Sequence, residues 1–393
     1  MRFVGPDYNL GIPPRAKSPK HRYRATATFI FLVLISLSSF VIAQAPAATF
    51  DDVVASATEA REHNDVPAAV ALYMQAVQLK PDWPEGWWYL GMLQYGSGAY
   101  PAARDALTHF LALTPNSGPA LAVRGLCEFE TGEYPQSSQD IQQGLALGAG
   151  NQPRYENILR YHQLLLFTVN GDFETALREY AVFAKNGPPS PEILAGIGLA
   201  GLRIAARPQD IDPKQQDLVM AAGSAGFQFM AGNEENARQE FQSLFQRFPA
   251  AANAHYFYGY LLFADDPDLA IAEFKRELEV APSNAVTQVM LAWYFILRND
   301  ASGALPYAQK AATEAPDSPS AQLVLGRSLV ETGDVNQGMT HLQTALKLDP
   351  DNLEIHLALV KGYSESGRKD DATRERLLCI EMTKGVASAP ASP

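Results

Sequence analysis

Residues 196–201 have the spacing of a phosphate-binding loop: they read G-I-G-L-A-G. In the dinucleotide-binding fingerprint G-x-G-x-x-G, backbone N–H groups at a helix N-terminus meet the pyrophosphate, and a strand must precede the glycines. Here Pro191 starts a helical pattern a few residues upstream, and apolar residues continue at helical spacing through Leu202. The pattern favours close contact between two helices, and a cofactor site in the irregular segment 188–216 remains the alternative.

The other residues that could bind a metal or take part in catalysis are scattered along the sequence. Cys127 and Cys379 form no C-x-x-C pair, so neither a zinc knuckle nor a disulfide framework is encoded, and each is expected to fill core space. The sequence has no P-loop, H-E-x-x-H helix, EF-hand loop or G-x-S-x-G elbow. The histidines fall at unrelated positions, where we expect surface or groove-lining roles rather than a shared metal site: His21, His63, His109, His162, His255, His341 and His356. The sequence therefore predicts no catalytic residue, no metal and no cofactor, and we expect that the protein is not an enzyme.

The first 43 residues differ in composition from the rest. A basic stretch is followed by residues 25–43, which carry no charge, and small residues at its end make cleavage between Ala43 and Gln44 plausible. The alternative is an uncleaved membrane anchor formed by residues 25–43, since nineteen uncharged residues can just cross a bilayer. Both alternatives predict export to the bacterial periplasm or cell surface, with residues 44–49 as a linker.

The remainder of the chain is acidic. Six of the 31 basic and one of the 43 acidic residues lie in residues 1–43, which leaves 25 basic and 42 acidic residues and a net charge of −17. Such a surface repels phosphate backbones, so a nucleic-acid partner is not expected. Solubility is the favoured explanation of this acidity.

Prolines recur at a nearly constant interval. They end apolar helical stretches with gaps of 34, 33, 34 and 34 residues within two groups: Pro81 and Pro115, then Pro249, Pro282, Pro316 and Pro350. Twelve residues before each stands a small residue: Ala69, Ala103, Ala237, Ala270, Ala304 and Gly338. Small residues let antiparallel helices approach closely, and proline cannot continue a helix. Turns with glycine precede most second helices: Gly98, Gly132, Gly171, Gly232, Gly333 and Gly367. A period in this range is typical of a stacked array.

Two stretches resemble the tetratricopeptide repeat. One has Trp87-x-x-Leu90-Gly91, Ala103, Leu107 and Pro115; the other has Leu325-Gly326, Leu329, Gly333, Leu342, Ala345 and Pro350. The resemblance implies an all-α, right-handed superhelical solenoid of stacked antiparallel helix pairs with a concave binding face. We expect about nine units and one incomplete one, which begin near Phe50, Pro84, Gly118, Asn157, Pro191, Leu218, Ala252, Ala285, Pro319 and Leu353.

The repeat pattern is interrupted once. The unit from Pro191 lacks a second helix, and residues 207–215 are expected to form a loop that divides an N-terminal array, 50–206, from a C-terminal array, 216–383. Residues 384–393 are expected to form a disordered tail. The last two units carry a polar, mixed-charge set that suits a solubilising cap: Arg327, Glu331, Lys361 and Glu365.

The inner positions that the resemblance implies hold mostly aromatic residues. The resulting partner groove comprises Trp88, Tyr95, Phe129, Tyr161, Phe229, Tyr256, Tyr260, Phe263 and Trp293. Aromatic residues at helical spacing are usually core; if these are accessible, they suit a peptide laid along the surface. The lysine, asparagine and arginine with which some tetratricopeptide repeats clamp a C-terminal carboxylate are absent from these positions. The sequence thus predicts an exported scaffold or adaptor that binds a protein or peptide, with a self-associating spacer as a further alternative.

Overall fold

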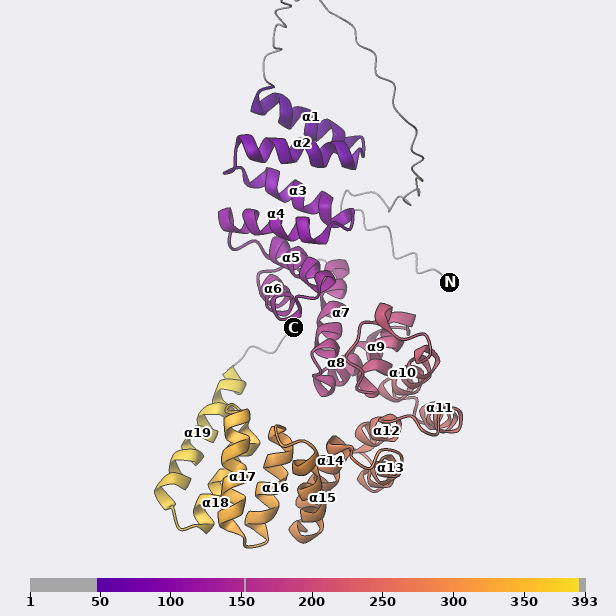
Figure 1. Cartoon of the computed structure of the whole chain (residues 1–393), viewed down its shortest axis with the longest axis vertical. Helices are drawn as coiled ribbons and strands as arrows, with labels where there is room; N and C mark the ends of the chain where they lie inside the picture. Colours follow the sequence, from indigo (N-terminus) through magenta and orange to yellow (C-terminus); the bar gives the residue numbers. More distant parts are fainter. Residues whose placement is uncertain (1–47, 152, 389–393) are drawn as a thin grey trace, which may run out of the picture. The chain divides into compact units, whose positions relative to one another are not determined.

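The computed structural model describes residues 48–151 and 153–388, and within these it contains nineteen α-helices, one short 3-10 turn and no strand (Figure 1). The helices of the first half are α1 (Phe50–Glu62), α2 (Val66–Leu79), α3 (Pro84–Gly96), α4 (Tyr100–Leu113), α5 (Gly118–Thr131), α6 (Tyr134–Ala146), α7 (Pro153–Val169), α8 (Phe173–Asn186) and α9 (Pro191–Gly201). The second half has α10 (Gln216–Met230), α11 (Glu234–Arg247), α12 (Ala254–Leu262), α13 (Pro267–Val280), α14 (Ala285–Leu297), α15 (Ala301–Glu314), α16 (Pro319–Glu331), α17 (Val335–Leu348), α18 (Leu353–Glu365) and α19 (Lys369–Ser388).

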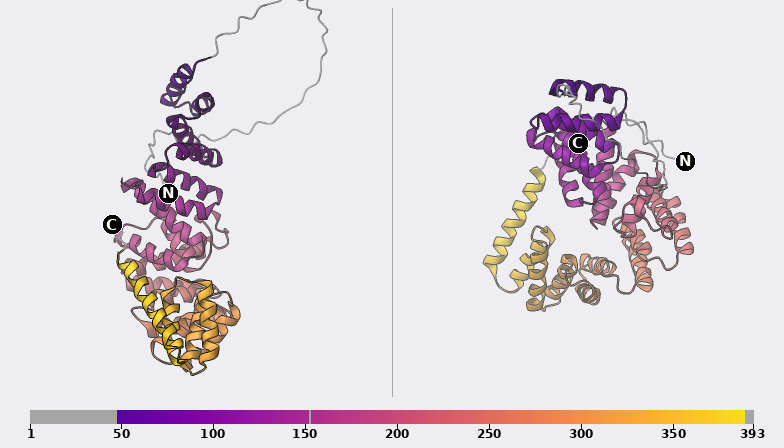
Figure 2. Two further views of the ribbon diagram at one scale, coloured as in Figure 1. Left: turned by 90° about the vertical axis from the view of Figure 1, so that its left-hand side faces the viewer. Right: turned by 45° about the horizontal axis from the view of Figure 1, so that its top comes forward.

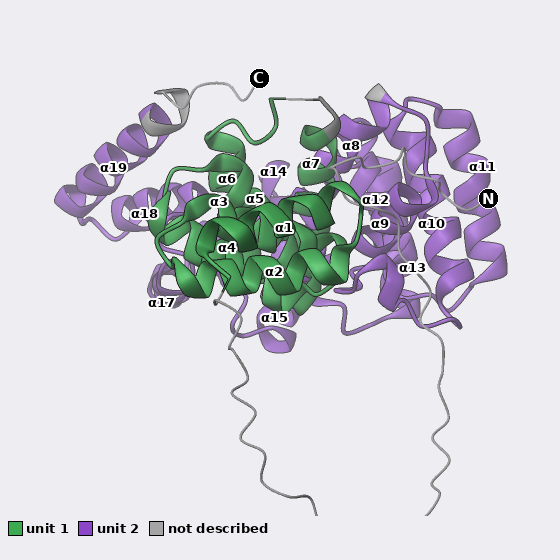
Figure 3. Cartoon of the chain, turned by 90° about the horizontal axis from the view of Figure 1, so that it is seen from above, with its two compact units in different colours: residues 1–166 green, residues 167–393 purple. Residues whose placement is uncertain are grey.

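The chain forms two compact units, residues 1–166 and 167–393, with the division inside α7 (Figure 3). Within each unit, helices that follow one another pack in antiparallel pairs, and the views of Figure 2 show these pairs from two further directions. The all-helical prediction is confirmed.

The helix boundaries follow the proline and glycine pattern. Seven of the ten expected first helices begin at the expected residue: Phe50, Pro84, Gly118, Pro191, Ala285, Pro319 and Leu353. The other three begin at Pro153, Gln216 and Ala254, within four residues of the expectation. The six expected turn glycines all have positive φ angles, between 74° and 99°, a region that is costly for other residues.

Small residues lie where the paired helices cross, as predicted. Ala69, Ala103, Ala237, Ala270 and Ala304 are 0% exposed. At the sixth position, a Cβ on Gly338 would lie 2.7 Å from the carbonyl oxygen of Gly326, so α16 and α17 approach almost backbone to backbone. The repeat period therefore reflects the spacing of these helix crossings.

A side chain six residues after the turn proline ties each of several repeats together. Its nitrogen donates a hydrogen bond to the proline carbonyl oxygen, at 2.8–2.9 Å, in four pairs: Trp87 to Pro81, Gln288 to Pro282, Gln322 to Pro316 and His356 to Pro350. His356 is only 4% exposed and also bonds Glu375 through its Nδ1 at 2.7 Å, so the expectation of a surface role is wrong for this histidine.

The expected loop is present between α9 and α10. Residues between α9 and α10 contain only the 3-10 turn Pro208–Asp210. Across this loop α9 packs tightly on α10: a Cβ on Gly198 would lie 2.8 Å from the carbonyl carbon of Val219. Both helices belong to the second compact unit, whose boundary with the first lies at 166/167. The predicted division into two repeat arrays at 207–215 stays a prediction. Helix α9 thus packs against α10, the first helix of the next repeat, where other first helices pack against a second helix of their own repeat.

The C-terminal end differs from its expectation in two ways. Helix α19 runs to Ser388, five residues into the expected tail, and residues 389–393 lie outside the described part of the chain. The last pair also exposes apolar residues: Leu357, Leu377 and Ile380 are 46%, 57% and 43% exposed. The last helix pair therefore exposes apolar side chains beside the polar, mixed-charge set.

The leader, residues 1–43, and most of the linker lie outside the described residues. Among the described helices, none is both long enough and apolar enough to cross a membrane.

Candidate functional site

The nine residues of the expected groove differ in their exposure. Seven are partly exposed: Trp88, Tyr95, Tyr161, Phe229, Tyr260, Phe263 and Trp293. Phe129 and Tyr256 are each only 1% exposed, so neither offers a surface to a partner. Four of the nine lie in the first unit and five in the second. We describe each set by itself.

In the second unit, Tyr256 is the buried anchor of an aromatic cluster. Its ring, on α12, lies 6.2 Å from that of Tyr260 and 5.9 Å from that of Phe274, and the hydroxyl donates a 3.0 Å hydrogen bond to Oε1 of Glu174 on α8. Burial, and then the negative charge of Glu174, raises the pKa of this hydroxyl well above its usual value. Tyr256 therefore remains a hydrogen-bond donor and fixes α12 against α8.

Arg203 completes this anchor from the turn after α9. Its guanidinium pairs with Glu174 and lies 4.8 Å from the ring centroid of Phe173 and 5.5 Å from that of Tyr256. The residue has a φ of +57°, which is uncommon outside glycine. The charge pair and the two rings hold the backbone in this conformation.

The partly exposed residues stand beside this anchor. Tyr260 lies one helical turn after Tyr256 and hydrogen-bonds to Arg178, which is exposed on α8. Burial also raises the pKa of Tyr260, although the hydrogen bond from Arg178 opposes this shift. Phe263 follows α12 and packs at 6.1 Å on Phe274. Tyr260, Phe263 and Arg178 thus present two aromatic rings and a positive charge on one rigid base, which suits the binding of a peptide.

Trp293 provides a second aromatic position on α14. The guanidinium of Arg327, on α16, lies 5.4 Å from its ring centroid. Arg327 is in turn held by Glu331 at 3.1 Å, and Glu331 also pairs with Lys361 on α18 at 3.2 Å. The charged residues that the sequence suggested as a cap, Arg327, Glu331 and Lys361, therefore lie on α16 and α18, the first helices that follow α14 and Trp293.

In the first unit, the expected residues pack against neighbouring rings. Trp88 lies 5.5 Å from Phe110, and Tyr95 lies 5.9 Å from Tyr100. Tyr161 contacts His162 at 5.7 Å. These contacts leave part of each of the three side chains at the surface.

Sequence reasoning missed Glu174, Arg178 and Arg203. None of them belongs to the expected groove. Glu174 and Arg178 lie on α8 and Arg203 lies in the turn after α9, and their side chains contact Tyr256 or Tyr260 on α12. The one available signal was the interruption of the repeat itself at Pro191, which marks a place where residues meet outside the regular pattern.

The fingerprint glycines serve helix packing. All three are buried in α9. A Cβ on Gly196 would lie 2.6 Å from the Cζ of Tyr180, and one on Gly201 would lie 2.5 Å from the ring of Phe257. Protein side chains thus occupy the space that a pyrophosphate would need. Among the residues described by the structure, no group of three or more histidine, cysteine, aspartate or glutamate side chains is arranged to hold a metal ion.

Comparison with known proteins agrees with the repeat architecture. The family model of the tetratricopeptide repeat matches residues 54–118 and 260–319. These two regions of the chain are tetratricopeptide repeats. The two matched regions include the α3–α4 pair and the α14–α15 pair, which carry Trp88 and Trp293. No curated protein matches the chain in sequence.

Several solved tetratricopeptide repeat structures are similar to part of the chain. MamA residues 41 to the end from Desulfovibrio magneticus RS-1 is 17% identical, with a TM-score of 0.38; the match covers 43% of this chain and 96% of MamA. MamA from AMB-1 is 21% identical, with a TM-score of 0.35 over 42% of this chain and 98% of that one. YrrB, described as having an unusual peptide-binding site, is 18% identical, with a TM-score of 0.37 over 43% of this chain and 88% of YrrB.

Proposed function

We propose that this tetratricopeptide repeat protein is an exported, non-catalytic scaffold that binds a peptide segment of a partner protein on the first helices of its second unit. The observation that carries the proposal is a set of three partly exposed aromatic side chains. Tyr260 and Phe263 lie beside the buried, hydrogen-bonded Tyr256, and Trp293 lies on α14 against the guanidinium of Arg327. Rigid aromatic side chains flanked by arginine are the residue types that dominate binding energy at protein interfaces.

Removal of the three exposed rings tests this proposal. We expect Tyr260→Ala, Phe263→Ala and Trp293→Ala together to weaken partner binding by about a hundredfold or more, because hot-spot aromatics each contribute about 2 kcal/mol. The mature chain, immobilised, captures partners from an extract of the exporting cell, and mass spectrometry identifies those that the triple variant loses. Tyr256 stays unchanged, since loss of this buried anchor would destabilise α12.

The matched control replaces three exposed leucines elsewhere, Leu79, Leu113 and Leu348, by alanine. Circular dichroism must show equal helicity for both triple variants. If both capture the same partners as the unchanged chain, the aromatic surface has no role in binding and the proposal fails. A sedimentation experiment separates the spacer alternative, which requires self-association of the mature chain.

Export is tested on the N-terminus. The uncharged residues 25–43 behind a basic stretch support removal of the leader. We expect the full-length gene product in a bacterial host to be recovered outside the cytoplasm with an intact mass that begins at Gln44. A membrane-bound chain that retains its leader would identify the anchor alternative, whereas a full-length chain in the cytoplasm would contradict export.

A further inference from the structure

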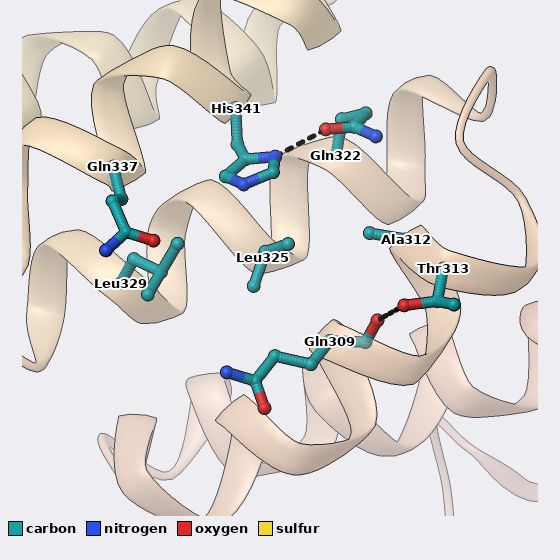
Figure 4. A pocket seen from close by; sticks show the side chains of 8 residues that line it. All are labelled: Gln309, Ala312, Thr313, Gln322, Leu325, Leu329, Gln337 and His341. Carbon is teal, nitrogen blue, oxygen red and sulfur yellow. Dashed lines mark hydrogen bonds between the residues drawn. The ribbon is translucent and has the colours of Figure 1, made fainter.

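A pocket lies on the second unit between helices α15, α16 and α17. Its volume is about 410 Å³, and Figure 4 shows the residues that line it: Gln309, Ala312, Thr313, Gln322, Leu325, Leu329, Gln337 and His341. Ala312, Leu325 and Leu329 are 6–9% exposed and form an apolar floor, whereas Gln309 and Gln337 are exposed at the rim. None of the eight carries a formal charge when His341 is neutral.

The hydrogen bonds around Gln322 determine the tautomer of His341. The Nε2 group of Gln322 donates to the carbonyl oxygen of Pro316 at 2.8 Å, since that oxygen can only accept. The Oε1 atom of Gln322 must then face Nδ1 of His341, at 2.7 Å. Because this oxygen can only accept, Nδ1 carries the proton. In a neutral ring this leaves Nε2 as a hydrogen-bond acceptor. Burial lowers the pKa of His341, which favours the neutral ring.

The neighbouring repeats explain why the pocket is open. Thirty-four residues earlier, the positions of Leu329 and His341 hold Phe295 and Tyr307, whose rings stack at 5.8 Å and fill the corresponding space. Thirty-four residues later, the position of His341 holds Glu375, which is bonded to His356. The pocket therefore arises from two differences between neighbouring repeats. Leu329 stands where the preceding repeat has the ring of Phe295, and His341, whose Nε2 is a hydrogen-bond acceptor, stands where it has Tyr307.

We propose that this pocket binds the side chain of a glutamine in a peptide partner. Its two methylene groups would lie on Leu325 and Leu329, and its carboxamide N–H would donate to Nε2 of His341. The carboxamides of Gln309 and Gln337 supply both donors and acceptors for the remaining N–H and oxygen. A carboxylate of the same shape has no N–H to donate to Nε2, and no lining residue offers it a positive charge. A sugar is a poorer fit, because the pocket is lined by no phenylalanine, tyrosine or tryptophan ring on which it could stack.

The pocket lies on the side of α16 away from Arg327 and Glu331, and it shares no residue with the aromatic set Tyr260, Phe263 and Trp293. The two sites can thus succeed or fail separately. The pocket is accordingly a second recognition site, beyond the surface proposed above.

The test uses the mature chain and N-acetyl-L-glutamine methylamide as a probe. We expect saturable binding in a ligand-detected NMR titration, with a Kd on the order of millimolar, and a matching shift of the His341 ring nitrogens in histidine-labelled protein. N-acetyl-L-glutamate methylamide is expected to bind at least about tenfold more weakly, because the acceptor would be left without its donor.

Two variants locate the binding. Leu329→Phe with His341→Tyr restores the aromatic pair of the preceding repeat and should abolish binding while the helix content is retained. Gln309→Ala with Gln337→Ala changes only exposed side chains and should weaken binding about tenfold. The proposal is wrong if the probe shows no saturable binding up to about 100 mM, if the glutamate probe or glucose binds as well, or if both double variants bind like the unchanged chain.

Discussion

Replacement of Gly223 by alanine is expected to lower the free energy of unfolding of the second unit by about 3 kcal/mol. A Cβ at this position would lie 2.6 Å from the carbonyl carbon of Leu194 and closer still to its oxygen, and 3.2 Å from the backbone nitrogen of Gly198. These are backbone atoms of α9 that cannot move aside as a flexible side chain could. The added methyl group must therefore separate α9 from α10.

The effect should be large because α9 has no partner helix of its own. Urea denaturation followed by helical circular dichroism measures it, with Gly187→Ala as the control: a Cβ on Gly187 meets nothing within 4 Å, and its φ of −161° suits any residue. We expect the control to stay within about 0.5 kcal/mol of the unchanged chain. An unchanged midpoint for Gly223→Ala would show that α9 and α10 do not cross this closely in solution.

The repeat could be predicted from sequence because its signals are local. A proline follows the second helix of several pairs, and a small residue stands twelve positions before it. Pro282 and Ala270 therefore carry the same information as Pro316 and Ala304. In an array, each pair contacts its neighbours, and the local pattern is enough to place most helix starts. Trp293 and Tyr260 could be assigned to first helices for the same reason.

The exposure of individual aromatic residues could not be predicted in this way. Tyr256 and Tyr260 lie one turn apart on α12, yet the former is 1% exposed and the latter is partly exposed. Tyr256 is covered by Glu174 and Arg203, from α8 and the turn after α9, and by Phe274, and contacts from other helices are not visible in the local pattern. Phe129 is covered in a comparable way by Tyr134 and His162, with ring centroids 5.7 Å and 5.1 Å from its own.

The division of the chain into units was also beyond the sequence pattern. A loop such as 207–215 indicates a break along the chain, but contacts through space decide whether it divides the fold. Gly198 and Gly223 allow α9 and α10 to join across that loop more closely than most helices of a regular repeat. Glycines that appeared as a possible cofactor motif are thus what makes the irregular segment part of one unit.

In the first unit, Glu128 is expected to make stability depend on pH. It is 6% exposed on α5, and its nearest positive group, Nε of Arg124, lies 3.8 Å from its Oε1. Arg124 instead binds Asp140 with two hydrogen bonds, at 2.5 and 2.9 Å. Burial, and then the negative charge of Asp140, raises the pKa of Glu128 to about 7 from an ordinary value of 4.5.

The sign of the effect follows from proton binding. Between pH 4.5 and pH 7 the folded chain holds the Glu128 proton while the unfolded chain releases it, so the free energy of unfolding falls as pH rises through this range. The pKa difference corresponds to about 3 kcal/mol when the group is ionised in both states. Glu128→Gln removes the charge, and at pH 8 we expect this variant to be more stable than the unchanged chain by about 2–3 kcal/mol. At pH 4 the two should have nearly equal stability.

Urea denaturation at pH 4, 6 and 8 measures this difference, which should widen steadily with pH. Glu59→Gln, at an exposed position of α1, reports what the loss of one surface charge does by itself. A Glu128→Gln chain that is less stable at pH 8 would mean that the attraction between Glu128 and Arg124 outweighs the cost of burying the carboxylate. In that case the ionised Glu128 would stabilise the packing of α5 on α6, because its ion pair with Arg124 would offset the free-energy cost of its burial.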